Sequence, residues 1–413
     1  MSNPEIVILH YSVSPIIGGV ELVIEAHARE MIAAGYPVTL LAGRGEQDAL
    51  PEGAHLVKLP LLDSQNEAIL SLNDQLEKGQ VSETFDAITE RIQHALDEVI
   101  APASRVIVHN VLTKHFNLPL TAALHRLIDA RPNQKWIAWC HDFSWTSSRS
   151  RETLHDGYPW DLLRTYRRDV RYVTVSDARR AELAHLLACP PKKIAVVYNG
   201  VDPEELLGLS HNIALLVDRL HLLSSDLILL MPVRVTHAKN VEFALEVTRD
   251  LVEQGVHAQL IVVGPPDPHD ESSMAYFRSL QAMRDRLGLH QQAHFIYEIS
   301  SPDSQPTILS NSEVGELYRL SDGIFMPSIS EGFGIPVLEG GLTGVRVFTT
   351  PIPASVEIGQ EDVVMLELSE GARNTAQKII EWSKNDATYQ LRRNVRQNYT
   401  WHSIFQKSIQ PLL

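Results

Sequence analysis

The chain has 413 residues, of which 44% are apolar. One hydrophobic core rarely serves a chain of this length, so we expect two domains. Its 36 basic and 51 acidic side chains give a formal net charge of −15, which has the wrong sign for a nucleic-acid-binding protein. The two cysteines, Cys140 and Cys189, exclude a disulfide framework; we expect Cys140 in the core, Cys189 in a turn, and neither in catalysis.

The N-terminus enters an apolar run without a basic leader, and no uninterrupted apolar stretch reaches about 18 residues. Secretion and membrane spanning are therefore not expected. The sequence favours a cytoplasmic protein and leaves open a peripheral contact with the inner membrane face.

Short β-branched runs alternate with helical patterns from the first residues onward, which is typical of parallel sheets covered by helices on both faces. The first βαβ unit comprises a strand at 6–9, a Gly18-Gly19 loop, a helix from about 20 to 34 and a strand at 38–41. Residues 45–104 give no clear pattern. Further strands are expected at 106–109, 136–140, 172–175 and 194–197.

The same pattern starts again in the second half. Turn residues at 199–203 mark the junction, and we expect a hinge at 199–205 with 204–225 as connecting helix and loop outside the core. The predicted domains are therefore 1–200 and 205–395, both Rossmann-like. The second is expected to have strands at 227–233, 259–263, 294–297, 323–326, 345–349 and 363–366.

The segment from 321 to 339 indicates a strand, a glycine loop and a helix start. Gly332 and Gly334 let the backbone approach a ligand closely, and Pro336 suits a first helical turn, so free N–H groups there could face a diphosphate. Glu331 and Glu339 could hold sugar hydroxyls in the same site. The alternative is that Glu339 only complements the helix dipole and Glu331 is solvated.

Arg234 and Lys239 lie where a predicted strand ends and a helix begins at about 241. Two cations there could bind a diphosphate and stabilise its charge as a glycosidic bond breaks, or they could simply be solvated. Gly18 and Gly19 offer N–H groups at the first helix, but no G-x-G-x-x-G follows the first strand, which disfavours a nicotinamide or flavin oxidoreductase.

His141 follows the predicted strand at 136–140 and could contact a reacting sugar or move a proton, although a lone loop histidine is more often structural. The 18 histidines show no metal-binding spacing, so no metal site is assigned. A basic cluster follows at Arg164, Arg167, Arg168 and Arg171. It is read as a solvated helix face, with an anionic lipid or acceptor surface as the alternative.

Together these motifs resemble family 4 of the glycosyltransferases, the group 1 enzymes, over nearly the whole chain. The resemblance implies a retaining enzyme of the GT-B fold, with two Rossmann-like domains whose parallel sheets face across a donor-binding cleft. Glu331 and Glu339 match the E-x7-E motif, the first near the donor sugar and the second on the nucleotide ribose. The residues that fit between or beside them in the donor site are Gly264, Gly332, Phe333, Gly334, Ile335 and Pro336.

By the same resemblance, Arg234 and Lys239 match the diphosphate pair, Gly18-Gly19 the N-terminal phosphate loop and His141 the histidine near the donor sugar. Residues 199–202 look like the interdomain signature, and the chain end at 401–405 resembles a helix, about 396–413, that returns to the first domain. Two departures stand out. Asn240 replaces a frequent glycine, and Gly340-Gly341 replace small helical residues at a cost of roughly 1 kcal/mol each.

The expected function is retaining transfer of a hexose from a UDP- or GDP-sugar to an acceptor hydroxyl of a carbohydrate, a lipid-linked glycan or a small molecule, in polysaccharide, glycolipid or glycoside biosynthesis. No cofactor beyond the nucleotide-sugar co-substrate and no metal is expected. A sugar-nucleotide epimerase, a phosphorylase or a non-catalytic sugar-nucleotide sensor remain alternatives, because fold alone does not fix chemistry. The sequence leaves the oligomeric state open.

Overall fold

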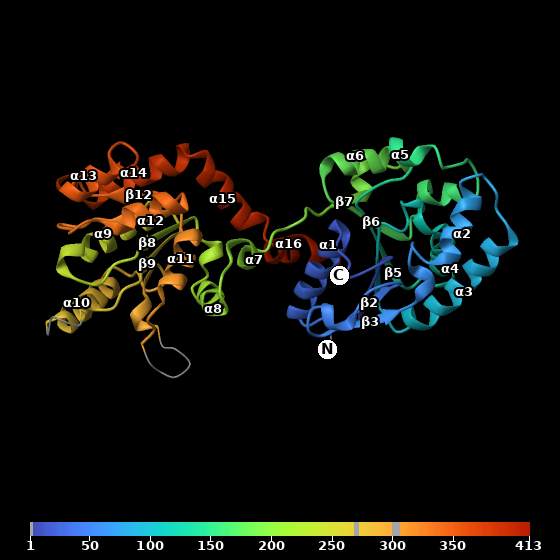
Figure 1. Ribbon diagram of the computed structural model, residues 1–413, viewed down its shortest axis with the longest axis horizontal. Coiled ribbons are helices and arrows are strands. Elements are labelled where there is room, and N and C mark those ends of the chain that lie inside the picture. Colours follow the sequence, from blue (N-terminus) through green and yellow to red (C-terminus); the bar gives the residue numbers. More distant parts are fainter. Residues whose placement is uncertain (1–2, 268–271, 300–305) are drawn as a thin grey trace. The chain divides into compact units, whose positions relative to one another are not determined.

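The computed structural model describes residues 3–267, 272–299 and 306–413. Contacts divide the chain into two compact units (Figure 1). Unit 1 comprises Met1–Gly200 with Trp401–Leu413, and unit 2 comprises Val201–Thr400. Each unit is a parallel sheet with helices packed on it, so each has the Rossmann-like α/β architecture that the alternating pattern predicted.

Unit 1 contains a seven-stranded parallel sheet in the order β3-β2-β1-β4-β5-β6-β7. The strands are β1 Ile6–Leu9, β2 Val38–Ala42, β3 Ala54–Lys58, β4 Arg105–His109, β5 Lys135–Cys140, β6 Val170–Thr174 and β7 Ile194–Val196. The helices are α1 Gly19–Ala33, α2 Glu67–Leu76, α3 Glu83–Ile100, α4 Leu118–Ala130, α5 Ser148–Arg151, α6 Asp177–Leu186 and α16 Trp401–Ile404.

The two faces of this sheet have separate cores. Side chains of α2, α3 and α4 pack with Val7 and Leu9 on one face, whereas α1 and the C-terminal segment pack with Ile6 and Ile8 on the other. Because successive strand residues point to opposite faces, a strand buried on both faces is a continuous apolar run, as in β1. The edge strand β3 was missed because only its first residue is buried.

Unit 2 contains a six-stranded parallel sheet in the order β10-β9-β8-β11-β12-β13. The strands are β8 Leu227–Met231, β9 Ala258–Val262, β10 Ala293–Phe295, β11 Gly323–Met326, β12 Arg346–Thr349 and β13 Val364–Met365. The helices are α7 Pro203–Leu207, α8 His211–Arg219, α9 Val241–Glu253, α10 Ser273–Arg286, α11 Asn311–Leu320, α12 Ile335–Thr343, α13 Pro353–Gly359, α14 Gly371–Asn385 and α15 Ala387–Asn398.

The prediction that 204–225 lies outside the core was wrong. Ile213 and Val217 on α8, and Leu222 just after it, are fully or almost fully buried in the core of unit 2. Ile213 and Val217 are four positions apart and so lie on one face of α8, which packs on the core of the second domain. The strand predicted at 294–297 is also shorter, because a turn of 3₁₀ helix at Ile296–Glu298 ends it.

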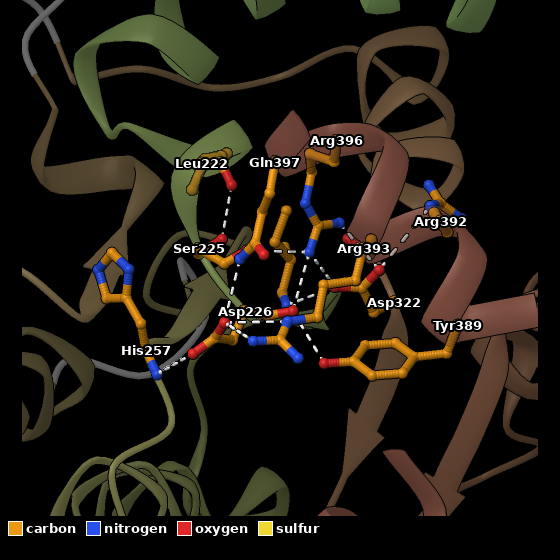
Figure 2. A network of polar contacts seen from close by, with 12 residues as sticks. Leu222, Ser225, Asp226, His257, Asp322, Tyr389, Arg392, Arg393, Arg396 and Gln397 are labelled. Carbon is orange, nitrogen blue, oxygen red and sulfur yellow. Dashed lines mark hydrogen bonds and ion pairs between the residues drawn. The ribbon is translucent and has the colours of Figure 1, made fainter. Parts of the chain in front are cut away.

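The C-terminal return begins at Trp401 and not at about residue 396. Helix α15 belongs to unit 2, where Arg396 forms a two-pronged ion pair with the fully buried Asp322 at 2.9 Å (Figure 2). Asp322 also accepts a hydrogen bond from the backbone N–H of Ile228 at 2.8 Å. This network ties α15 to the beginnings of β8 and β11, so the chain cannot leave unit 2 before α15 ends.

Beyond α15 the chain enters unit 1. A Cβ on Gly200 would lie 2.7 Å from the backbone nitrogen of Trp401, so the two crossing segments pack as closely as a glycine allows. Ile404, Phe405 and Ile409 are then buried against the α1 face of the sheet. Among the described helices, none is both long and apolar enough to cross a membrane.

Candidate active site

Both sheets have a point at which the strand order reverses. In unit 2 it lies between β8 and β11, and in unit 1 between β1 and β4. Such a point at the carboxyl edge is the usual ligand position in open α/β sheets, because the loops after the two neighbouring strands lead away in opposite directions. The sequence-predicted residues follow β1, β5, β8, β9 and β11, so they lie at or next to these two points.

In unit 2 the structure joins Lys239, after β8, to Glu331, after β11. The Lys239 ammonium donates to Glu331 Oε2, and Ser328 Oγ donates to Glu331 Oε1 at 2.7 Å. The Glu331 side chain is 8% exposed and that of Lys239 20%. The alternative in which Glu331 is merely solvated is therefore wrong: it is a paired carboxylate, and its partner is one of the two predicted diphosphate ligands.

Backbone contacts hold the same two loops together. Asn240, which has a left-handed φ of 53°, donates from its side-chain amide to the carbonyl of Pro327 at 3.2 Å. The N–H of Ile329 donates to the carbonyl of Ala238 at 2.8 Å. Asparagine adopts the left-handed region more readily than most residues other than glycine, and here its side chain adds a link between the β8 and β11 loops.

Arg234 is exposed on the β8 loop, and Gly264 lies against its backbone. A Cβ on Gly264 would be 2.3 Å from the carbonyl oxygen of Val233 and 2.7 Å from Cα of Arg234. Glycine is thus required for the loops after β8 and β9 to touch. Gly264 shapes the backbone that carries Arg234, whatever it contributes to a ligand directly.

Helix α12 begins at Ile335 after a left-handed Gly334, with Pro336 in its first turn and no side-chain cap at its N-terminus. Phe333 and Ile335 are 57% and 58% exposed beside it. An uncapped helix start leaves backbone N–H groups and the positive end of the helix dipole free to face an anion.

The first turn of α12 contains no acidic residue, and Glu339 lies beyond it. Glu339 is therefore not placed to complement the helix dipole. Its carboxylate accepts a hydrogen bond from the Tyr318 hydroxyl at 2.5 Å. Burial, followed by this bond, raises the pKa of Tyr318 well above its usual range. Gly340 has a packing role, because a Cβ there would meet Val347 at 2.6 Å.

In unit 1, His141 belongs to a cluster of buried histidines. Its Nε2 lies 3.1 Å from Nδ1 of His109, the last residue of β4, and its backbone N–H donates to the Asn110 side chain at 2.8 Å. His10, after β1, contacts the carbonyl of His109 through Nδ1 at 2.9 Å. Desolvation by burial, and then the nearby His10, lower the pKa of His141 to about 4, so its imidazole is neutral at pH 7.

The tautomer of His141 follows from its neighbour. His109 Nε2 is buried and has no hydrogen-bond partner among the described residues. An orphaned N–H is rarer in buried sites than an orphaned acceptor, so the proton of His109 belongs on Nδ1, where it is donated to His141 Nε2. His141 then carries its own proton on Nδ1. In the sequence, His109 is distinguished only by its position at a strand end.

The Gly18-Gly19 loop is already faced by an acid. A Cβ on Gly18 would lie 2.2 Å from Glu21 Oε2, and the Glu21 carboxylate accepts from Ser12 Oγ at 2.7 Å. A phosphate at the start of α1 would have to displace Glu21 or approach from beside it. Gly19 has open space around it, so it is the more accessible of the two predicted glycines.

The basic cluster was expected to be a helix face, and this prediction was wrong. It runs through a short 3₁₀ turn, Trp160–Arg164, an irregular segment and the start of β6. Arg164 pairs with Asp156 and Asp161, and Arg167 with Asp129 and Asp169. These carboxylates offset much of the positive charge that an anionic lipid or acceptor would need. Cys140 is a core residue as predicted, and burial raises the pKa of its thiol to about 12.

Unit 2 also has a cavity of about 620 Å³ that does not contain the predicted site. It is lined by residues at the beginnings of β11 and β12, on α12 and on α15, among them Asp322, Leu338, Arg346 and Tyr389. This is the amino edge of the sheet, opposite the loops that carry Lys239 and Glu331. Among the described residues of both units, there is no group of three histidine, cysteine or acidic side chains suited to a metal ion.

These features define a class: a chain with two Rossmann-like units, whose second unit presents a paired lysine and glutamate, an exposed arginine and an uncapped helix at its strand switch point. Two family models match it, Glycosyltransferase Family 4 over residues 17–205 and Glycosyl transferases group 1 over 218–400. The chain belongs to the group 1, family 4 glycosyltransferases, and its fold is GT-B.

Among curated proteins, the chain is similar to an uncharacterised glycosyltransferase of Methanocaldococcus jannaschii, with 24% identity over 49% of this chain and 47% of the relative. It is also similar to mannosylglucosylglycerate synthase of Petrotoga mobilis, with 23% identity over 68% and 67%. The chain thus spans about half to two thirds of the length of these relatives. A solved glycosyltransferase from Rickettsia africae is 17% identical, with a TM-score of 0.38, over 99% of this chain and 98% of that one.

Proposed function

We propose that the protein transfers a hexose, with retention of anomeric configuration, from a UDP- or GDP-sugar to an acceptor hydroxyl. The observation that carries this proposal is the Lys239–Glu331 pair at the strand switch point of unit 2. A buried carboxylate next to a lysine, an exposed Arg234 and the free start of α12 form a set suited to a ligand that has both hydroxyls and a diphosphate.

In this proposal the ion pair opens when the donor binds. The diphosphate takes over the Lys239 ammonium, together with Arg234 and the N–H groups at the start of α12. Glu331 then accepts hydrogen bonds from the sugar hydroxyls, and Glu339 from the ribose. His141, neutral and protonated on Nδ1, is suited to donate a hydrogen bond to the sugar and not to act as a base at pH 7.

The chemical step breaks the bond between the anomeric carbon and the diphosphate oxygen. The acceptor oxygen forms the new bond on the same face, and its proton passes to the departing diphosphate. Charge grows on the diphosphate as the old bond breaks, so Lys239 and Arg234 stabilise the transition state more than the bound donor. Glu331 and Glu339 do not act as a glycosidase acid and nucleophile.

The first experiment is calorimetric binding against UDP-, GDP- and ADP-sugars, because donor binding needs no knowledge of the acceptor. One nucleotide should bind, and Lys239→Ala should weaken that binding. Lys384→Ala, which removes an exposed lysine of α14, is the matched control and should leave it unchanged. If no nucleotide sugar binds, the proposal is wrong.

Product analysis with the bound donor separates the alternatives. A transferase releases nucleoside diphosphate only slowly without an acceptor, whereas an epimerase converts the donor sugar without one. A phosphorylase requires inorganic phosphate, and a sensor binds the donor without turnover. The configuration of the new linkage, read by NMR, decides between retention and inversion.

A further inference from the structure

Unit 1 has a cavity of about 350 Å³ that the donor site does not use. Its floor is apolar, formed by the buried Leu76, Leu118 and Trp160. Polar side chains surround this floor, namely Ser64, Gln65, Asn73, Asp74, Glu77, His115 and Thr153. An apolar surface edged by amide, hydroxyl and carboxylate groups suits a ligand with a C–H face and many hydroxyls, and the volume lies at the lower end of small-ligand pockets.

One wall of this cavity is bonded to the loop that carries His141. The His115 backbone N–H and its Nδ1 both contact Ser144 Oγ, at 3.0 and 2.7 Å. Thr113 Oγ1 donates to the carbonyl of Asp142 at 2.8 Å. The cavity therefore lies at the same carboxyl edge of the sheet as His141, held there by hydrogen bonds between the β4 and β5 loops.

The wall opposite is α2, and it is fixed to the first wall. The side-chain amide of Asn73 donates to the carbonyl of Phe116 at 3.0 Å. Phe116 is 41% exposed at the cavity rim, with the Lys114 ammonium 4.6 Å from its ring centre. The cavity is thus a preformed space between α2 and the segment after β4.

The charge of the lining is negative. Desolvation by burial, and then the neighbouring Lys114, lower the pKa of His115 to about 4, so this histidine is neutral at pH 7. Neither lysine nor arginine is among the residues that line the cavity, and the formal charges of this lining are the carboxylates of Asp74 and Glu77. The Lys114 ammonium lies beside the lining, against the Phe116 ring at the rim. A phosphorylated or carboxylated ligand would meet like charges there.

Asp74 and Glu77 are not placed to stabilise α2. Asp74 lies in the last turn of α2 and Glu77 at its C-cap, where the helix dipole disfavours negative charge. Both are exposed, and neither forms an ion pair among the described residues. Their replacement by amides should leave the fold intact and increase its stability slightly.

We propose that this cavity holds the acceptor, and that it selects an uncharged or amine-bearing sugar and rejects phosphorylated or carboxylated ones. The role of this ligand as the acceptor rests on the proposed function, whereas its chemical class follows from the cavity lining alone. Selection then belongs to the carboxylates of α2 and not to the arginines at 164–171, two of which are already paired.

Saturation-transfer NMR with methyl α-glucopyranoside, glucosamine and glucose-6-phosphate tests the ligand class. The first two should bind, and the phosphate roughly tenfold more weakly. In the double variant Asp74→Asn, Glu77→Gln the difference should shrink to less than about threefold. Glu52→Gln, Glu90→Gln changes the net charge equally, at exposed acids outside the cavity, and should leave the preference as it was.

A second variant tests whether the sugar binds in this cavity. Phe116→Ala removes an exposed rim side chain and should abolish most of the saturation transfer to the neutral sugar, while binding of the nucleotide donor stays unchanged. Equal binding of all three probes, no binding of any, or no effect of either cavity variant would overturn the assignment. Transfer to a phosphorylated sugar would also overturn this assignment but would leave the proposed function standing. Binding of the neutral sugars in this cavity, without transfer from any donor, would overturn the proposed function but leave the assigned ligand class standing.

Discussion

Removal of the Arg396 guanidinium should destabilise unit 2 more than any single change at its surface. Asp322 is fully buried, and Arg396 donates to both of its oxygens at 2.9 Å. In Arg396→Met the carboxylate stays buried without this partner, which typically costs about 3–5 kcal/mol. The nearest remaining cation is Arg392, whose Nε is 3.8 Å from Asp322, so we expect a value near the lower end.

For a unit of 200 residues, a loss of about 3 kcal/mol lowers Tm by roughly 6–12 °C. Scanning calorimetry should show this as a lower transition for one unit and an unchanged transition for the other. The double variant Arg396→Met, Asp322→Asn removes both charges and keeps an acceptor for the Ile228 N–H, so it should recover part of the loss.

Arg373→Met is the matched control, because Arg373 is exposed on α14 and should change stability by less than about 0.5 kcal/mol. The reasoning fails if Arg396→Met costs less than about 1 kcal/mol, or if the double variant is as unstable as the single one. Either result would mean that the buried carboxylate is neutral or hydrated without its arginine.

Three further outcomes follow from the sites. Glu339→Ala should weaken donor binding by about ten- to a hundredfold, since a charged hydrogen bond is lost, whereas Lys239→Ala should weaken donor binding less and mainly lower kcat; unchanged turnover in both would refute the site. His109→Leu should shift the ring proton of His141 towards Nε2 and lower kcat. His109→Asn should retain much of the Nδ1 tautomer and of kcat, and NMR chemical shifts of labelled histidines report the tautomer. Burial lowers the pKa of His125 from 6.5 to about 4, so the unfolded chain binds this proton first. The unfolding free energy should therefore fall as pH falls from 6.5 towards 4, with up to about 1.4 kcal/mol per pH unit from His125 and further contributions of the same sign from His115 and His141. Urea midpoints at several pH values should show the summed slope, and His125→Gln should reduce it by the contribution of this one histidine.

The sequence determined the class of fold because its strands are buried on both faces. Runs such as Ile6–Leu9 and Leu227–Met231 are continuously apolar and short, which is typical of strands in a sheet covered on both sides. The edge strand β3 escaped prediction for the same reason, since it is half exposed. The strand ends also located Lys239, Glu331 and His141, because ligands of such sheets bind at their carboxyl edge.

Tertiary structure decided which of these residues meet. Lys239 and Glu331 are 92 positions apart, and only the placement of β11 beside β8 brings them together. In the same way, His109 contacts His141 because β4 pairs with β5. The limit between the units also depended on a long-range contact, the Arg396–Asp322 pair, which keeps α15 in unit 2. Local patterns report burial, whereas pairing across a sheet depends on strand order, which no local pattern encodes.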